Sequence, residues 1–183
     1  MTVSELINKH SGTAFSFEVL PPLKGTGTEA LFSTIDALKE FHPEYINITT
    51  HRSEYVYVEQ PDGTYIRHFM RRRPGTVAVA SAIMQKYDIK VVPHVVVSGM
   101  TKEDIEYMLL DLQFLGIQDI LILRGDKAKD DAKFQPVRDG YTHASELIEQ
   151  VNLFNQGKFV DGTPIKKPGK PFSYGVAAYP EKH

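Results

Sequence analysis

Alternation between two hydrophobic periods is the feature that most constrains the fold of this chain. Short runs rich in apolar and β-branched residues alternate with segments whose apolar residues recur at helical spacing. The predicted strands are residues 14–20, 45–50, 90–97, 119–123 and 173–178. The predicted helices are residues 4–10, 28–41, 75–87, 101–115 and 141–156. Strands alternating with helices in this way are typical of a parallel sheet with crossover helices.

Five parallel strands fit two architectures, an open doubly wound sheet or the first part of an eight-stranded barrel of ~250 residues. Two insertions depart from tight βα packing. Residues 53–73 place Pro61-Asp62-Gly63 between alternating runs and predict a β-hairpin after the second strand. Residues 157–171, rich in Gly, Pro and Lys, predict a surface excursion rather than a linker. We therefore expect a single α/β domain over residues 1–183.

Composition excludes several classes of protein. Lys and Arg number 21 against 23 Asp and Glu, a formal charge of −2, which argues against a general nucleic-acid binder. The absence of cysteine excludes disulfides, zinc–thiolate sites and a cysteine nucleophile. No secretory signal and no apolar run of ~18 residues is visible. We expect a cytoplasmic protein with no membrane segment and no nucleic-acid partner.

Reactive groups of parallel α/β folds collect at the carboxyl ends of strands. Glu18 lies in F-S-F-E-V-L-P-P, and a carboxyl group desolvated by apolar neighbours would suit a general acid. A strand-end glutamate that reaches solvent is an equally open interpretation. His94, in V-V-P-H-V-V-V, is either a site residue or, more commonly in such a run, a satisfied core histidine. The histidines show no metal-ligand spacing, so we expect no metal site.

The fourth predicted strand ends in L-R-G-D, residues 123–126. Glycine lets the backbone approach a flat or anionic ligand, arginine offers a planar fork, and aspartate adds a negative acceptor. A βα turn with a surface ion pair is the alternative. The basic run at residues 67–73 is either a solvated face, which is more common, or a steering surface for an anionic substrate. The usual dinucleotide and nucleotide glycine loops are absent.

Four motifs in order resemble the 5,10-methylenetetrahydrofolate reductase family over about residues 14–183. F-S-F-E-V-L-P-P is similar to its opening strand, P-H-V to its third-strand motif, L-R-G-D to its fourth-strand flavin motif, and V-A-A-Y-P-E-K-H to its fifth-strand motif. The resemblance implies a (β/α)8 TIM barrel truncated after about five strands, with the β-hairpin inserted after strand two. It makes residues 1–183 the N-terminal portion of a TIM-barrel reductase.

The resemblance also implies an activity, namely flavin-dependent reduction of 5,10-methylenetetrahydrofolate to 5-methyltetrahydrofolate in one-carbon metabolism and methionine biosynthesis. It implies FAD as cofactor, NADH or NADPH as co-substrate, small-molecule substrates as partners, and a homo-oligomer. Glu18 would be the catalytic general acid, and the charge of Asp126 would favour a cationic folate iminium. The residues that it implies around the flavin are Thr49, His94, Arg124, Gly125, Asp126, His143, Ala144, Ala177, Tyr179 and His183.

The chain departs from the family pattern at several positions. Thr50-His51-Arg52 stands where many members have Tyr-Gly-Ala, and His143 stands where a flavin-contacting tyrosine is common. The family barrel continues for roughly a hundred residues beyond P-E-K-H, by analogy with its eight strands. We therefore expect an incomplete and inactive fragment. The alternatives are a non-catalytic αβ domain that retains the flavin-site motifs, and an unrelated barrel enzyme, which the lack of a lysine or metal-ligand pattern at strand ends disfavours.

Overall fold

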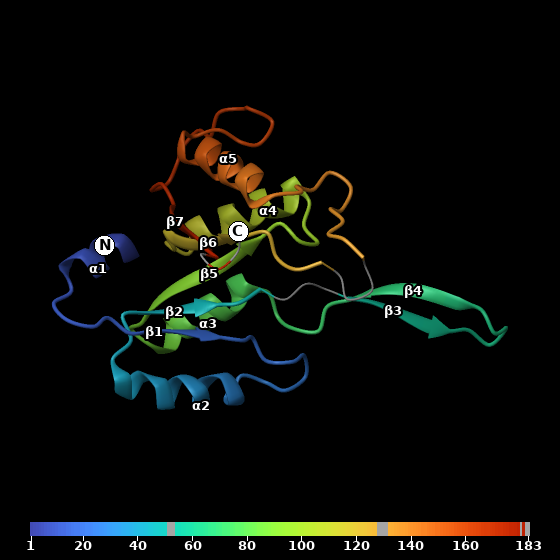
Figure 1. The fold of residues 1–183 in the computed structure, drawn as a ribbon, viewed down its shortest axis with the longest axis horizontal. Coiled ribbons are helices and arrows are strands. Elements are labelled where there is room, and N and C mark those ends of the chain that lie inside the picture. The colour runs from blue at the N-terminus through green and yellow to red at the C-terminus, as the bar shows by residue number, and fades with distance from the viewer. Residues whose placement is uncertain (51–53, 128–131, 180, 182–183) are drawn as a thin grey trace.

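Five parallel strands form one sheet in the order β1-β2-β5-β6-β7. The computed structural model describes residues 1–50, 54–127, 132–179 and 181. The strands of the sheet are β1 (Ser16–Val19), β2 (Tyr45–Ile48), β5 (Lys90–Val96), β6 (Asp119–Leu123) and β7 (Ser173–Val176). The sheet is open, with β1 and β7 at its edges, and Figure 1 shows it from one side. The predicted parallel α/β fold is confirmed.

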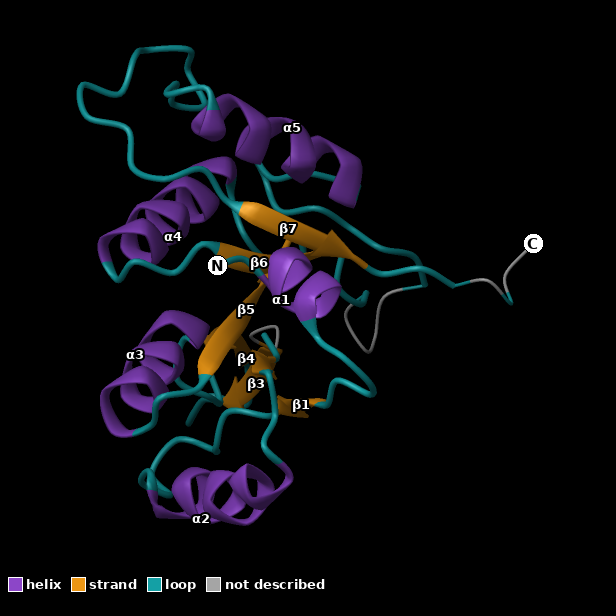
Figure 2. Cartoon of the chain, turned by 90° about the vertical axis from the view of Figure 1, so that its left-hand side faces the viewer, coloured by secondary structure: helices purple, strands orange, loops and turns teal. Residues whose placement is uncertain are grey.

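Four helices cover one face of this sheet, as Figure 2 shows. They are α2 (Glu29–Leu38, continued by a 3-10 turn Lys39–Phe41), α3 (Thr76–Lys86), α4 (Lys102–Phe114) and α5 (Ala144–Asn155). β-Branched residues of the strands, including Ile46, Val95 and Ile122, are fully buried in this layer. They form the core because side chains of a strand alternate between its two faces, and this face is covered by helices.

The opposite face of the sheet, called here the inner face, carries the alternate side chains of each strand. The register places Glu18 beside Asn47 and His94 beside Leu121. The short helix α1 (Val3–Lys9) lies on this side of the sheet in Figure 2. A cavity of about 310 Å³ lies between α1 and the inner face. Its lining runs from Tyr45 and Asp119, at the starts of their strands, to Asn47, the register partner of Glu18. The Asp119 carboxylate on its wall accepts the Val3 backbone N–H at 2.8 Å.

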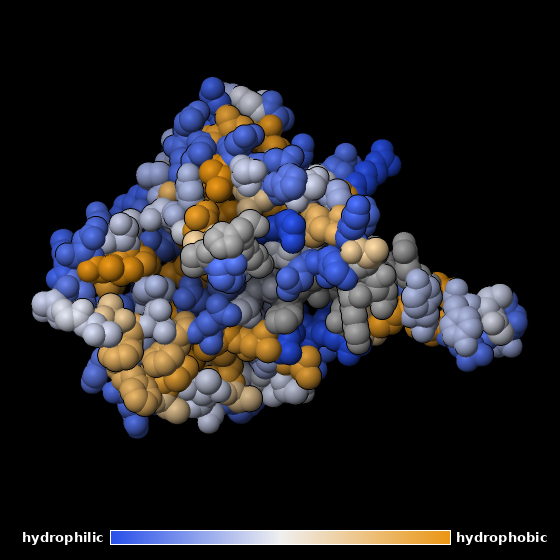
Figure 3. All heavy atoms as spheres, viewed as in Figure 1, coloured by the Kyte–Doolittle hydropathy of each residue, from blue (hydrophilic) through white to orange (hydrophobic). Residues whose placement is uncertain are grey.

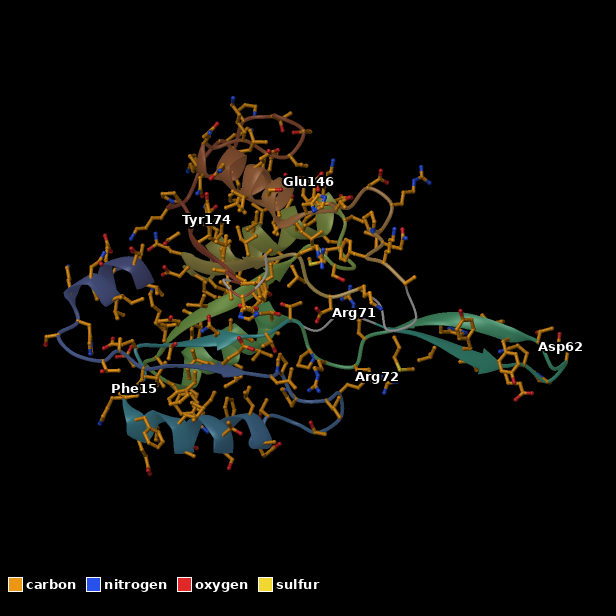
Figure 4. The ribbon with its side chains drawn as sticks, viewed as in Figure 1. Phe15, Asp62, Arg71, Arg72, Glu146 and Tyr174 are labelled. Atoms are coloured by element: carbon orange, nitrogen blue, oxygen red, sulfur yellow. The ribbon has the colours of Figure 1, made fainter. Side chains whose placement is uncertain are left out.

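The predicted β-hairpin is confirmed. Strands β3 (Glu54–Glu59) and β4 (Tyr65–Met70) pair antiparallel and project from the body as an arm (Figure 1). Asp62, labelled at the arm's tip in Figure 4, accepts hydrogen bonds from the Thr64 backbone N–H at 3.0 Å and hydroxyl at 2.7 Å. Gly63 has a φ of 80°, the left-handed conformation that glycine adopts without steric cost.

All predicted elements exist, and the differences concern their ends. Thr101 caps α4 with a capping box, in which the Asp104 N–H donates to the Thr101 hydroxyl at 3.0 Å. Thr28 precedes α2 in a helical conformation and makes no side-chain cap. Residues 157–171 contain no helix or strand, so the predicted surface excursion is confirmed. In the described part of the chain, no helix has the length and apolar character needed to cross a membrane.

Candidate functional site

Hydrogen bonds of Thr49 and Thr50 connect the carboxyl ends of β1, β2 and β5. The Thr49 N–H donates to the Val19 carbonyl at 3.1 Å. The Thr50 hydroxyl donates to the His94 carbonyl at 2.7 Å and lies 2.7 Å from the hydroxyl of Thr76 at the start of α3. These bonds, one from backbone and two from the Thr50 hydroxyl, connect the strands past their last ladder pairs.

Glu18 and His94 meet on the inner face. The Nε2 atom of His94 lies 3.6 Å from the Oε2 atom of Glu18. The imidazole is 5% exposed, whereas the Glu18 side chain is 57% exposed. The expectation that Glu18 is desolvated by its sequence neighbours is therefore wrong for the described structure. Phe17 and Val19 point to the helix-covered face, because alternate residues of a strand face opposite ways.

Burial controls the charge of His94. It lowers the pKa of the imidazole below its ordinary 6.5, and the negative charge of Glu18 opposes this effect without cancelling it. The ring is therefore neutral at pH 7 and keeps one N–H donor and one acceptor nitrogen. Its Nε2 atom is buried and has no hydrogen-bond partner. His94 is thus a buried histidine, but one that is left unsatisfied on the inner face.

The L-R-G-D turn packs tightly against the end of β5. Gly125 has a φ of 79°, and a Cβ atom there would lie 2.8 Å from the Cβ atom of Ser98. The Ser98 hydroxyl donates to the Asp126 carbonyl at 2.8 Å, and its backbone N–H donates to the Arg124 carbonyl at 2.9 Å. Close packing against Ser98 therefore requires glycine at position 125, independently of any ligand that the backbone approaches there. The Asp126 residue is exposed at this end of the sheet.

Arg124 and the start of α5 flank this turn. The Arg124 guanidinium lies over the ring of Phe134, 5.1 Å from its centroid. His143 and Ala144 begin α5, where the Glu146 carboxylate accepts the backbone N–H groups of Thr142 and His143, both at 2.8 Å (Figure 4). These two bonds hold the pKa of Glu146 below its ordinary 4.5. This arrangement caps the helix.

The remaining predicted site residues lie beyond β7. Ala177 and Tyr179 are exposed, and His183 lies outside the described residues. Ser98 and Thr76 take part in the hydrogen bonds at the strand ends, and neither was among the predicted site residues. Ser98 is buried and directly follows the apolar run 90–97, so the same strand-end rule could have found it. Thr76 opens a helix and carries no comparable signal.

The arrangement supports proton transfer and electrostatic stabilisation. A carboxyl group beside a neutral imidazole can hold or release a proton, and an exposed carboxylate can favour a cation. β1 and β6 are three strand spacings apart, roughly 14 Å, so Glu18 lies on one side of the β2 and β5 ends, and Asp126, which follows β6, lies on the other. Among the described residues, no group of three or more His, Asp or Glu side chains could hold a metal ion.

Comparison with known proteins identifies the family. The sequence model of the family described as methylenetetrahydrofolate reductase matches residues 3–183. Methylenetetrahydrofolate reductase (NADH) 1 of Arabidopsis thaliana is 27% identical over 177 residues, 97% of this chain and 25% of the relative. The 5,10-methylenetetrahydrofolate reductase of Pectobacterium carotovorum is 25% identical over 168 residues, 92% of this chain and 44% of the relative. The chain thus spans less than half of these relatives. It belongs to the methylenetetrahydrofolate reductase family.

Proposed function

We propose that this chain forms the N-terminal portion of a (β/α)8-barrel reductase that converts 5,10-methylenetetrahydrofolate into 5-methyltetrahydrofolate, with NADH or NADPH as electron donor. The observation that carries the proposal is the pair formed by Glu18 and the buried His94 on the inner face. These two residues belong to the motifs F-S-F-E-V-L-P-P and P-H-V, which resemble the family's motifs. The name of the Arabidopsis relative specifies NADH. We further propose a cytoplasmic homo-oligomer.

The residues at the carboxyl ends fit FAD as the cofactor. The exposed guanidinium of Arg124 lies at this end of the sheet, and its planar fork suits an anionic or planar group of the cofactor. The chemistry that FAD supplies when bound is hydride transfer from a nicotinamide to the folate. The residues that we expect to hold it are Thr49, His94, Arg124, Gly125, Asp126, His143, Ala144, Ala177, Tyr179 and His183.

Two carboxyl groups of the chain have separate roles in this proposal. Glu18 donates a proton that helps to open the one-carbon ring of the folate to an iminium cation. The Asp126 carboxylate, exposed at the same end of the sheet, favours that cation over the neutral substrate. A barrel completed by further strands would pair with the open edges at β1 and β7 and would reduce the exposure of Glu18.

The test compares the two half-reactions of a polypeptide long enough to close the barrel. Glu18→Gln should retain nicotinamide oxidation with a quinone acceptor and lose folate reduction, because only the second needs the proton. Glu44→Gln, whose carboxylate pairs with His10 at 2.7 Å, is the matched control and should retain both. Equal loss in both half-reactions would contradict the role of Glu18.

Flavin content separates the reductase from its alternative. The extended polypeptide should carry a flavin absorption band close to one equivalent. A colourless extended protein that does not take up added FAD would favour the second candidate, a non-catalytic domain that retains the motifs. That candidate has support in the 57% exposure of Glu18.

A further inference from the structure

The buried Nε2 atom of His94 is the starting point for a second role of this histidine. Three buried side-chain atoms in the described part of the chain have no hydrogen-bond partner, and they belong to His94, Asp119 and Gln150. The unpaired Asp119 oxygen has Lys90 Nζ at 2.6 Å. The Gln150 Oε1 atom stays unpaired, although the amide nitrogen of that side chain donates to the Lys102 carbonyl at 2.9 Å. In the described part of the chain, the Glu18 carboxylate lies 3.6 Å from the His94 Nε2 atom.

The two side chains differ in freedom to move. His94 is fixed, because its ring is 5% exposed and the Thr50 hydroxyl holds its backbone carbonyl at 2.7 Å. Glu18 is mostly exposed and has three rotatable side-chain bonds. The separation of 3.6 Å exceeds a hydrogen bond, and a rotation of Glu18 that shortens it by less than ~1 Å would form one. The unsatisfied nitrogen therefore favours one position of the carboxyl group.

We propose that His94 is a positioning residue for Glu18, in which Nε2 holds the Glu18 carboxyl group against the inner face. A neutral imidazole with its proton on Nε2 suits this task, because this N–H can donate to an oxygen of the Glu18 carboxyl group whether that group is a carboxylic acid or a carboxylate. Glu18 is thereby held both before and after it gives up a proton. The contact stands by itself, whereas its catalytic meaning rests on the proposed function.

Glu18 is the charged residue beside the His94 imidazole in the described part of the inner face. On β2 the nearby inner-face residue is Asn47, which pairs with Val92, and Thr49 follows the end of that strand. On β6 the residue beside His94 is Leu121, and on β7 it is Gly175, so all four are uncharged. The Glu18 charge raises the pKa of His94 while burial lowers it. Removing that charge should therefore lower the pKa of His94 further.

The first experiment follows the His94 imidazole of this chain by nuclear magnetic resonance during a pH titration. Glu18→Gln should shift the midpoint downward, and Glu44→Gln, which changes the carboxylate that pairs with His10, should leave it in place. An unchanged His94 midpoint in Glu18→Gln would overturn the inference. This readout needs no flavin and no folate, so it stands even if the proposed function fails.

The second experiment is a double-mutant cycle in a polypeptide that reduces folate. His94→Leu should slow folate reduction by roughly 2-fold to 100-fold through lost coupling and should move its pH profile. His94→Gln, whose amide can donate or accept, should recover part of the loss. In a Glu18→Asp background, where the acid is retained but is one methylene shorter and moves away from Nε2, the two His94 variants should become equivalent in folate reduction, after correction for their quinone turnover. The same difference between them in both backgrounds would mean that His94 serves the flavin alone.

Discussion

At the residue scale, the charge of Asp126 can be separated from its shape. Asp126→Asn keeps the backbone carbonyl that accepts the Ser98 hydroxyl and removes the exposed negative charge. In a folate-reducing polypeptide, folate reduction should fall by ~10-fold to ~1,000-fold, the range for lost electrostatic stabilisation. Stopped-flow measurement of reduced-flavin oxidation by the folate would show this. An unchanged rate would mean that the carboxylate only belongs to the turn.

A second prediction at the residue scale concerns how the free energy of unfolding depends on pH, because the imidazole of His94 is buried. Its pKa is lowered from 6.5 in the folded chain, so the unfolded chain binds more protons just below pH 6.5. Stability should therefore be full above pH 6.5 and fall as the pH drops through that value. Urea unfolding of this chain between pH 7 and about 5 should show the loss, before most carboxylates protonate.

Two variants test whether His94 causes the loss of stability below pH 6.5. His94→Gln should flatten the pH dependence between pH 6.5 and about 5. His68→Gln, at an exposed position of the arm, is the control and should leave the slope unchanged. A slope that persists in His94→Gln would show that another group causes it.

At the scale of elements, one side chain joins α5 to Phe172, the residue that precedes the edge strand β7. The Asn155 amide donates to the Phe172 carbonyl at 3.0 Å, and its carbonyl oxygen accepts the Phe172 N–H at 2.7 Å. Asn155→Ala would leave both partly buried backbone groups unpaired and should lower the free energy of unfolding by about 1–3 kcal/mol. Asn152→Ala, which removes one exposed bond to Tyr174, should cost less than about 1 kcal/mol. Urea unfolding distinguishes them, and equal losses would contradict the role of Asn155.

The same scale shows what the sequence could predict. Periodicity identified every strand and helix, because the apolar face of an element determines the spacing of apolar residues along the sequence. For Asp119–Leu123 the predicted bounds equal those of β6. Periodicity could not distinguish Thr28 from Thr101, since only the backbone conformation before α4 lets the hydroxyl cap the helix. The strand-end rule found Glu18 and His94, but neither their contact nor the exposure of Glu18 is local, because both depend on which strands lie beside β1.

At the scale of the whole molecule, the open sheet leaves apolar surface at its margins. β1 and β7 each have one unpaired side, and Val176 on β7 is 55% exposed. Figure 3 shows apolar side chains gathered over β1 and α2, where Phe15 and Phe41 are exposed. The arm adds Tyr57 and Ile66. Unpaired strand edges with apolar neighbours invite pairing with another chain.

We therefore expect that a polypeptide of these 183 residues self-associates and has no reductase turnover. Sedimentation velocity should show a mass that rises with concentration. Val176→Lys should reduce the association, because a charge on an edge strand opposes pairing, whereas Tyr107→Lys, at an exposed position of α4, should not. Turnover should be absent because binding sites normally bury most of a ligand, and here the inner face lies open beside Glu18. The assay is nicotinamide oxidation with added FAD and either a quinone or methylenetetrahydrofolate. A monomer at all concentrations, or turnover comparable with that of a full-length relative, would contradict this expectation.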